Sequence, residues 1–209
     1  RAASSGVKIE SRDFNHARAC DGPRNDIGAP PMDFRDFPGE TTRSIAFLSR
    51  IPVPDSMFGS TQWKISGAVG VFPLAGIVIA LPAALLAALL SWLDVPSALT
   101  AILTLLTMVL VTGALHEDGL ADCADAFGAG GPRERMLDIL KDSRIGAYGT
   151  LAMIFSIALR AVALTVLIAI GPPLPMAVTL LSAAALSRAL MVWHWRRLPA
   201  ARSDGVSAG

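Results

Sequence analysis

Cysteine is scarce in this 209-residue chain, which contains only Cys20 and Cys123. The two lie far apart and neither belongs to a Cys-x-x-Cys pair, so the sequence indicates neither a disulfide framework nor a cysteine-based zinc site. An excess of charge of either sign is also missing, because 18 Lys and Arg stand against 17 Asp and Glu. This balance excludes nucleic-acid binding driven by bulk electrostatics.

Four long segments lack the polar face that a helix of a soluble bundle carries. They cover residues 65–93, 97–114, 151–170 and 174–195, and their only Lys, Arg, Asp or Glu residues are Arg160 and Arg188. At about 1.5 Å per residue, each is roughly long enough to cross a hydrocarbon core of about 30 Å. The sequence therefore predicts an all-α, polytopic integral membrane helical bundle in a lipid bilayer. Pro73 and Pro82 predict kinks in the first segment, or a first part that does not span.

The N-terminal residues 1–40 have no lasting apolar period and are dominated by Asp, Asn, Arg, Gly and Pro. Such a segment buries too little surface to offset chain entropy, so we expect a polar, disordered tail. Residues 41–209 then form a single membrane-embedded domain. At its start, the segment 43–54 combines an apolar face with Arg43 and Arg50, which predicts an interfacial helix or the lead-in to the first membrane segment.

Lysine and arginine are absent from the connections around Asp94 and Gly171. They gather instead before the first apolar segment, between the second and the third, and after the fourth. Because positively charged connections stay on the cytoplasmic side of a membrane, these three regions are expected to face the cytoplasm.

The connection between the second and third apolar segments is the most polar part of the expected bundle. On a helix, Asp118, Asp122 and Asp125 fall within about 60° of one another, since positions i, i+4 and i+7 share a face. At about 6 Å and an effective dielectric constant near 20, each carboxylate pair costs on the order of 3 kcal/mol. A bound cation would remove this repulsion, and oxygen ligands favour Mg²⁺, which commonly binds together with a substrate phosphate. The alternative is a solvated helix face, but ionisable groups beside a membrane segment favour a functional site.

A second polar motif, LKDSRIGAYG, follows at residues 140–149. The guanidinium group of Arg144 has the fork geometry that suits a phosphate, and Lys141 supplies a point charge. Gly146 and Gly149 allow a tight turn beside them. The candidate phosphate-binding residues of this motif are Lys141, Asp142, Ser143, Arg144, Gly146 and Gly149.

Together, HEDGLADCADAF and LKDSRIGAYG resemble the cobalamin synthase family, the adenosylcobinamide-GDP ribazoletransferases. Family members carry a His-x-Asp-Gly-x-Ala-Asp-x-x-Asp run followed by Lys-Asp-Ser-Arg-x-Gly-x-x-Gly. The segments FLSRIPVP and FPLAG, at residues 47–54 and 72–76, look like two further family segments, so the resemblance covers about residues 43–205. Glu117 and Ala126 depart from the commoner pattern, which has an apolar residue and a glycine there. Members usually continue with further apolar sequence, so we expect this chain to be incomplete at its C-terminus.

The resemblance implies an Mg²⁺-dependent transferase of a substituted phosphate group, acting late in cobalamin biosynthesis at the bacterial inner membrane. Its substrates would be adenosylcobinamide-GDP and α-ribazole or the 5′-phosphate of α-ribazole. A ribose hydroxyl would attack the cobinamide-linked phosphorus and GMP would leave. Mg²⁺ on Asp118, Asp122 and Asp125 would clamp the pyrophosphate, and one of these carboxylates or His116 would accept the hydroxyl proton. Arg144 and Lys141 would hold the GDP phosphates.

Several assignments stay open at this point. Arg50 is expected either to contact substrate or to lie at the membrane interface, and Arg188 either to reach a substrate phosphate or to pair with an acidic residue. A CDP-alcohol phosphotransferase also lines up Asp residues, but Asp122 stands where that pattern has an arginine. A cation- or proton-coupled transporter would place its carboxylates near the middle of the membrane, whereas these lie at one edge.

Overall fold

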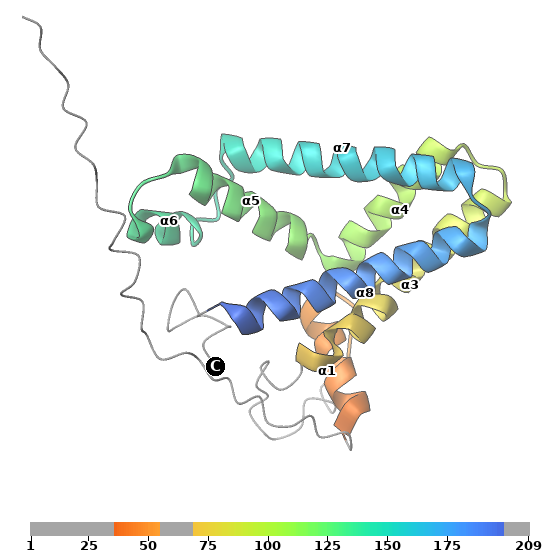
Figure 1. Cartoon of the computed structure of the whole chain (residues 1–209), viewed down its shortest axis with the longest axis horizontal. Coiled ribbons are helices and arrows are strands. Elements are labelled where there is room, and N and C mark those ends of the chain that lie inside the picture. Colours follow the sequence, from red (N-terminus) through yellow and green to blue (C-terminus); the bar gives the residue numbers. More distant parts are fainter. Residues whose placement is uncertain (1–35, 55–68, 199–209) are drawn as a thin grey trace, which may run out of the picture.

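The computed structural model describes residues 36–54 and 69–198, and both ranges are helical, without strands (Figure 1). This confirms the predicted all-α class. In chain order the elements are α1 (Phe37–Leu48), the 3₁₀ turn η4 (Val69–Val71), α3 (Phe72–Trp92), α4 (Ser97–Thr112), α5 (Leu115–Ala129), α6 (Arg133–Ile139), α7 (Ala147–Ile170) and α8 (Pro173–Arg197).

Helices α3, α7 and α8 are each long and apolar enough to cross a membrane. Helix α4 has 16 residues and meets the same criterion only together with α5, from which it is bent by 87°. The described residues therefore hold three candidate spans, or four if the bent pair is one span, which agrees with the membrane bundle expected from the four apolar segments. Pro73 lies in the first turn of α3, where its missing N–H costs nothing, and Pro82 lies inside this single helix.

The bend between α4 and α5 is made by Gly113 and Ala114, which have φ values of 64° and 60°. A left-handed backbone ends α4 sharply and favours glycine at the first of these positions. The side chain of Arg50 lies against Gly113, where a Cβ atom would collide with it. The N–H of Arg50 also donates a 2.8 Å hydrogen bond to the carbonyl of Val111, so the segment after α1 packs onto the bend.

Small residues bring α3 and α8 close together. A Cβ atom on Gly76 would lie 2.9 Å from the carbonyl oxygen of Ala184, and Ala75, Ala83 and Ala87 are almost fully buried. Close backbone approach of this kind is the usual way in which helices pack in a bilayer, where apolar burial alone gives little preference for helix over lipid. Phe72 anchors the end of this interface beside α1, within an apolar cluster that includes Leu48 and Val192.

Helix α7 follows a different path from α8. It packs along both α4 and α5, whereas α8 packs against α3 (Figure 1). The two helices meet at the turn that ends α7 and diverge from there. The two connections without lysine or arginine, α3–α4 and α7–α8, lie at the same end of the bundle, and α6 lies toward the other.

Helix α1 begins at Phe37, inside the segment expected to be a polar tail, while residues 1–35 lie outside the described part of the chain. Its first turn contains Pro38, and Asp36 just before it pairs with Arg43. The helix ends at Leu48, so the helix expected around residues 43–54 lies nearer the N-terminus than its sequence indicated. Pro52 and Pro54 follow in irregular structure, as expected for residues that cannot continue a helix.

Candidate functional site

The three aspartates lie on α5, as their spacing predicts. Asp118 is exposed, and Asp122 and Asp125 are half-buried on the same side of the helix. The helix ends at Ala129, and Gly130, its C-cap with a φ of 60°, turns the chain toward α6. The acidic face therefore belongs to one short, rigid element that follows directly from the bend after α4.

Asp125 joins the two polar motifs of the sequence. Its Oδ2 accepts a 2.7 Å hydrogen bond from the N–H of Gly146, and its Oδ1 accepts a 2.9 Å hydrogen bond from the N–H of Gly149. Gly146 is the N-cap of α7, so this carboxylate from α5 satisfies free N–H groups in the first turn of α7 and also interacts favourably with the helix dipole. The contact holds the segment 140–149 beside the acidic face.

The same contact explains the Gly-x-x-Gly spacing. A Cβ atom on Gly146 or on Gly149 would overlap the carboxyl group of Asp125. Gly146 has a φ of −97°, so it is the close approach of the carboxylate, and not a left-handed backbone, that requires glycine there. Gly128 is crowded in a similar way by the ring of Tyr148, which fixes the start of α7 against the end of α5.

Arg144 and Asp142 form a pair within the segment that joins α6 to α7. The Nε of Arg144 donates to both carboxylate oxygens of Asp142 at 3.0 Å, and its Nη2 donates to Oδ2 at 2.6 Å. These hydrogen bonds hold the pKa of Asp142 below its usual value and raise the pKa of Arg144. The side chain of Arg144 is 87% exposed, and Lys141 and Ser143 are exposed as well. The carboxylate of Asp142 thus binds the guanidinium group of Arg144, for which the sequence predicts a phosphate as the partner.

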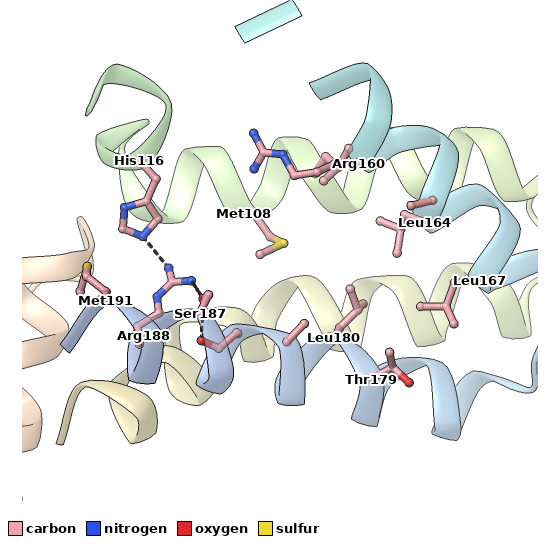
Figure 2. A pocket seen from close by; sticks show the side chains of 14 residues that line it. Met108, His116, Arg160, Leu164, Leu167, Thr179, Leu180, Ser187, Arg188 and Met191 are labelled. Carbon is pink, nitrogen blue, oxygen red and sulfur yellow. Dashed lines mark hydrogen bonds between the residues drawn. The ribbon is translucent and has the colours of Figure 1, made fainter. Parts of the chain in front are cut away.

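His116 and Arg188 lie apart from the acidic face. His116 Nε2 is 2.6 Å from Arg188 Nη2, and Arg188 Nη1 also donates to the hydroxyl of Ser187 at 2.8 Å (Figure 2). Arg188 is only 7% exposed, and no carboxylate of the described residues forms an ion pair with it. Both side chains line a cavity between α4, α7 and α8. The structure therefore does not bring His116 and Arg188 together with Asp118, Asp122 and Asp125.

The expected pairing of Arg188 with an acidic residue is made instead by Arg160. Its Nη1 lies 3.0 Å from Oε1 of Glu117, which is 7% exposed, and the pair links α5 to α7. Each partner stands out in the sequence, because Arg160 interrupts an apolar segment and Glu117 occupies a position that is often apolar. Nothing in the local pattern connects these two residues across 43 positions.

Arg50 lies at the bend between α4 and α5, where its backbone and side chain contact Val111 and Gly113. Arg50 is exposed. The structure thus gives Arg50 a packing contact, while a contact with substrate remains a prediction.

The donor set around the acidic face fits a hard cation that brings a phosphate with it. Across residues 36–54 and 69–198, no three His, Cys, Asp or Glu side chains form a ready-made metal site. The carboxylates of Asp118 and Asp122 make no ion pair there, and each oxygen of Asp125 accepts one N–H and retains further acceptor capacity. Because Mg²⁺ usually binds one or two carboxylates together with water and substrate phosphate, this arrangement is compatible with it, and Mg²⁺ remains a prediction.

Residues 41–209 match the family model described as cobalamin-5-phosphate synthase. The chain belongs to this family. It is 54% identical over 176 residues to the adenosylcobinamide-GDP ribazoletransferase of Sinorhizobium medicae (strain WSM419), and 51% identical over 176 residues to the protein of that name from Rhizobium meliloti (strain 1021). Each alignment covers 84% of this chain and 67% of the relative. No solved structure matches.

Membership of the cobalamin-5-phosphate synthase family confirms the resemblance found in the two polar motifs. It also favours this family over the two alternatives, a CDP-alcohol phosphotransferase and a transporter, since the relatives are named adenosylcobinamide-GDP ribazoletransferases. The Asp125 contact shows how the two motifs meet in space in this chain, although 21 and 24 residues separate the hydrogen-bonded pairs.

Proposed function

We propose that this chain is an adenosylcobinamide-GDP ribazoletransferase of the bacterial inner membrane, acting in the last steps of cobalamin biosynthesis. It would join adenosylcobinamide-GDP to α-ribazole, or to the 5′-phosphate of α-ribazole, and release GMP. The observation that carries the proposal is the contact of Asp125 with Gly146 and Gly149, because it unites the acidic face with the segment that holds Lys141 and Arg144.

The GDP group of the donor substrate would bind at this segment. Arg144 already holds a planar anion, the carboxylate of Asp142, in two-pronged geometry. A phosphate presents oxygens that suit the same fork, so it would take the place of Asp142 on Arg144. Lys141 is exposed nearby and would add a second positive charge. Asp142 thereby orients Arg144 when no phosphate is bound.

The acidic face would serve the reacting end of the donor. Mg²⁺ held by Asp118 and Asp122, with Asp125 beside them, would neutralise charge on the pyrophosphate. A P–O bond to the ribose oxygen forms, the P–O bond to GMP breaks, and the proton of the attacking hydroxyl passes to a carboxylate of α5. His116 is a weaker candidate for this base than Asp118 or Asp122, because its ring faces Arg188.

We infer that the acidic face lies on the cytoplasmic side. The cation-free connections α3–α4 and α7–α8 share one end of the bundle, and the cation-rich segments after α5 and at the end of α8 lie away from it. The positive-inside rule then favours a cytoplasmic position for α6 and for the segment 140–149. Nucleotide substrates and Mg²⁺ are available on that side.

A product assay tests the proposal. The purified chain in detergent micelles is supplied with Mg²⁺, adenosylcobinamide-GDP and α-ribazole, and adenosylcobalamin and GMP are measured by mass spectrometry. We expect equal amounts of the two products and loss of both when Mg²⁺ is chelated. A folded chain that forms neither product, or that releases GMP without adenosylcobalamin, would contradict the proposed transfer.

A further inference from the structure

A cavity of about 590 Å³ lies between α4, α7 and α8, in the space that opens where α7 and α8 diverge. Volumes of this order are typical of sites for small molecules. Figure 2 shows His116 and Arg188 at one end of the cavity and Leu164 and Leu167 toward the other. The cavity is therefore polar at one end and apolar along most of its length.

At the polar end, Arg188 has no ion-pair partner among the described residues. Arg160 and Glu117 form an ion pair, and among the described residues Arg188 hydrogen-bonds only with His116 and Ser187. Glu117 also attracts Arg188 electrostatically, but its Oε1 pairs with Arg160 and it forms no ion pair with Arg188. Arg188 is 7% exposed, and its Nε has no hydrogen-bond partner among the described residues. A buried guanidinium without a counter-ion is costly, and arginines within membrane helices normally pair or contact a polar ligand. An anionic group in the cavity would supply the missing partner.

The rest of the cavity is mostly aliphatic, with Arg160 and Thr179 as its other polar residues. Its 14 lining residues include Leu105, Leu164, Leu167, Leu180 and Met191, and none of them is Phe, Tyr or Trp. A site for a flat heterocyclic base commonly offers a ring to stack on, and the one ring in this lining, the imidazole of His116, is hydrogen-bonded to Arg188 at the polar end. It also lies on the side of α5 that carries His116, opposite the acidic face, because residues 116 and 118 differ by about 200° on a helix. An acyl chain suits such a lining better than either substrate of the proposed reaction.

We propose that this cavity binds a phospholipid whose headgroup has a net negative charge. The lipid phosphate pairs with Arg188, and one acyl chain lies between α7 and α8 along Leu164, Leu167 and Leu180. The bound lipid completes the packing between two helices that touch mainly at their connecting turn. This inference concerns a second ligand and does not depend on the transferase reaction.

Native mass spectrometry of the whole chain tests the proposal. The protein is released from detergent micelles that contain either phosphatidylglycerol, which is anionic, or phosphatidylcholine, which is zwitterionic, at equal concentration. We expect about tenfold more retained phosphatidylglycerol than phosphatidylcholine. Arg188→Gln should lower retention of phosphatidylglycerol about tenfold, and Arg188→Lys should restore part of it. Arg196→Gln, which removes an exposed charge from the same helix, is the matched control and should change nothing.

A second pair of variants covers the case in which Arg188→Gln fails to fold. Ala183 lines the cavity, so Ala183→Phe fills it without altering charge, whereas Leu190→Phe adds an aromatic ring at an exposed position on the same helix outside the cavity. Only Ala183→Phe should reduce lipid retention. Equal retention of the two lipids, or equal retention by wild type and Ala183→Phe, would overturn the proposal. Displacement of the lipid by soluble glycerol phosphate would also overturn it, because the site would then take a free phosphate.

Discussion

Oδ1 of Asp125 accepts a hydrogen bond from the backbone N–H of Gly149 at 2.9 Å, which joins the end of α5 to the first turn of α7. The second oxygen of the same carboxylate binds the N–H of Gly146. Asp125 therefore links the two polar motifs by hydrogen bonds, independently of any further role that its oxygens have toward a cation. The position of the segment 140–149 beside the acidic face depends on this one side chain lying close to two glycines.

The first prediction concerns the contact of Asp125 with Gly149. Gly149→Ala should lower the melting temperature in detergent, because its Cβ would overlap the Asp125 carboxyl group, and overpacking of this kind costs about 1–3 kcal/mol. Transferase activity should fall with it, since the segment 140–149 would shift away from the acidic face. Gly119→Ala is the matched control: it lies on α5, and a Cβ atom there meets nothing within 4 Å. Equal melting temperatures for the two variants would contradict the close packing of Asp125 against Gly149.

The sequence was sufficient for the parts of the structure that depend on local periodicity. The shared face of Asp118, Asp122 and Asp125, and the position of His116 away from it, both follow from about 100° per residue on a helix. The partners of these residues were not predictable. Gly149 reaches Asp125 only because α6 reverses the chain, and Arg188 reaches His116 across 72 residues. Contacts of that kind depend on how helices pack, which no local pattern specifies.

A second prediction concerns Glu117 and Arg160. Replacing either alone, as Glu117→Gln or Arg160→Gln, leaves the other charge without its partner and should destabilise the protein by about 1–3 kcal/mol, less than a fully buried pair because the Arg160 side chain is 41% exposed. The double variant should lose less than the sum of the single losses, since neither charge is then stranded. The losses are measured from thermal melting, in detergent, of the wild type, the two single variants and the double variant. If the loss of stability in the double variant equals the sum of the two single losses, Glu117 and Arg160 have no coupling energy.

A third prediction concerns the cation. Asp122→Asn keeps the size of the side chain but removes one negative charge from the acidic face, so it should weaken Mg²⁺ binding and lower turnover by orders of magnitude while membrane insertion persists. The control is Asp94→Asn in the α3–α4 connection, where φ is 54° and asparagine tolerates that backbone. Titration of activity with Mg²⁺ distinguishes the two. An unchanged Mg²⁺ dependence in Asp122→Asn would remove Asp122 from the metal site.

A fourth prediction concerns orientation. In a variant without Cys20 and Cys123, a cysteine introduced by Gly130→Cys should react with a membrane-impermeant thiol reagent only when the cytoplasmic side is open. A cysteine introduced by Pro172→Cys, between α7 and α8, should react from outside intact cells. Both follow from the distribution of lysine and arginine. Labelling of the Gly130→Cys protein from outside would reverse the proposed orientation of the acidic face.

The last prediction concerns Arg144. Arg144→Lys keeps the charge but loses the fork, so kcat/KM for adenosylcobinamide-GDP should fall about tenfold to a hundredfold, while KM for α-ribazole, which has no phosphate, should change little. A structural role would give a different pattern. If Arg144 mainly stabilises its loop through Asp142, then Asp142→Asn should produce the same loss as Arg144→Lys, because either change removes the two-pronged hydrogen bonding between the two side chains.

The two roles also differ in their pH dependence. Arg144 lowers the pKa of Asp142, so the pair is intact above that lowered pKa and is lost as the pH falls through it. If the segment 140–149 depended on this pair, it would become less stable only in acid. Activity near neutral pH would then stay close to normal in any variant that keeps this segment in place. If Arg144 binds phosphate, Asp142→Asn frees the fork and leaves donor binding intact or slightly tighter, whereas Arg144→Lys weakens it at every pH. Equal losses in both variants, for both substrates, would remove Arg144 from the phosphate site.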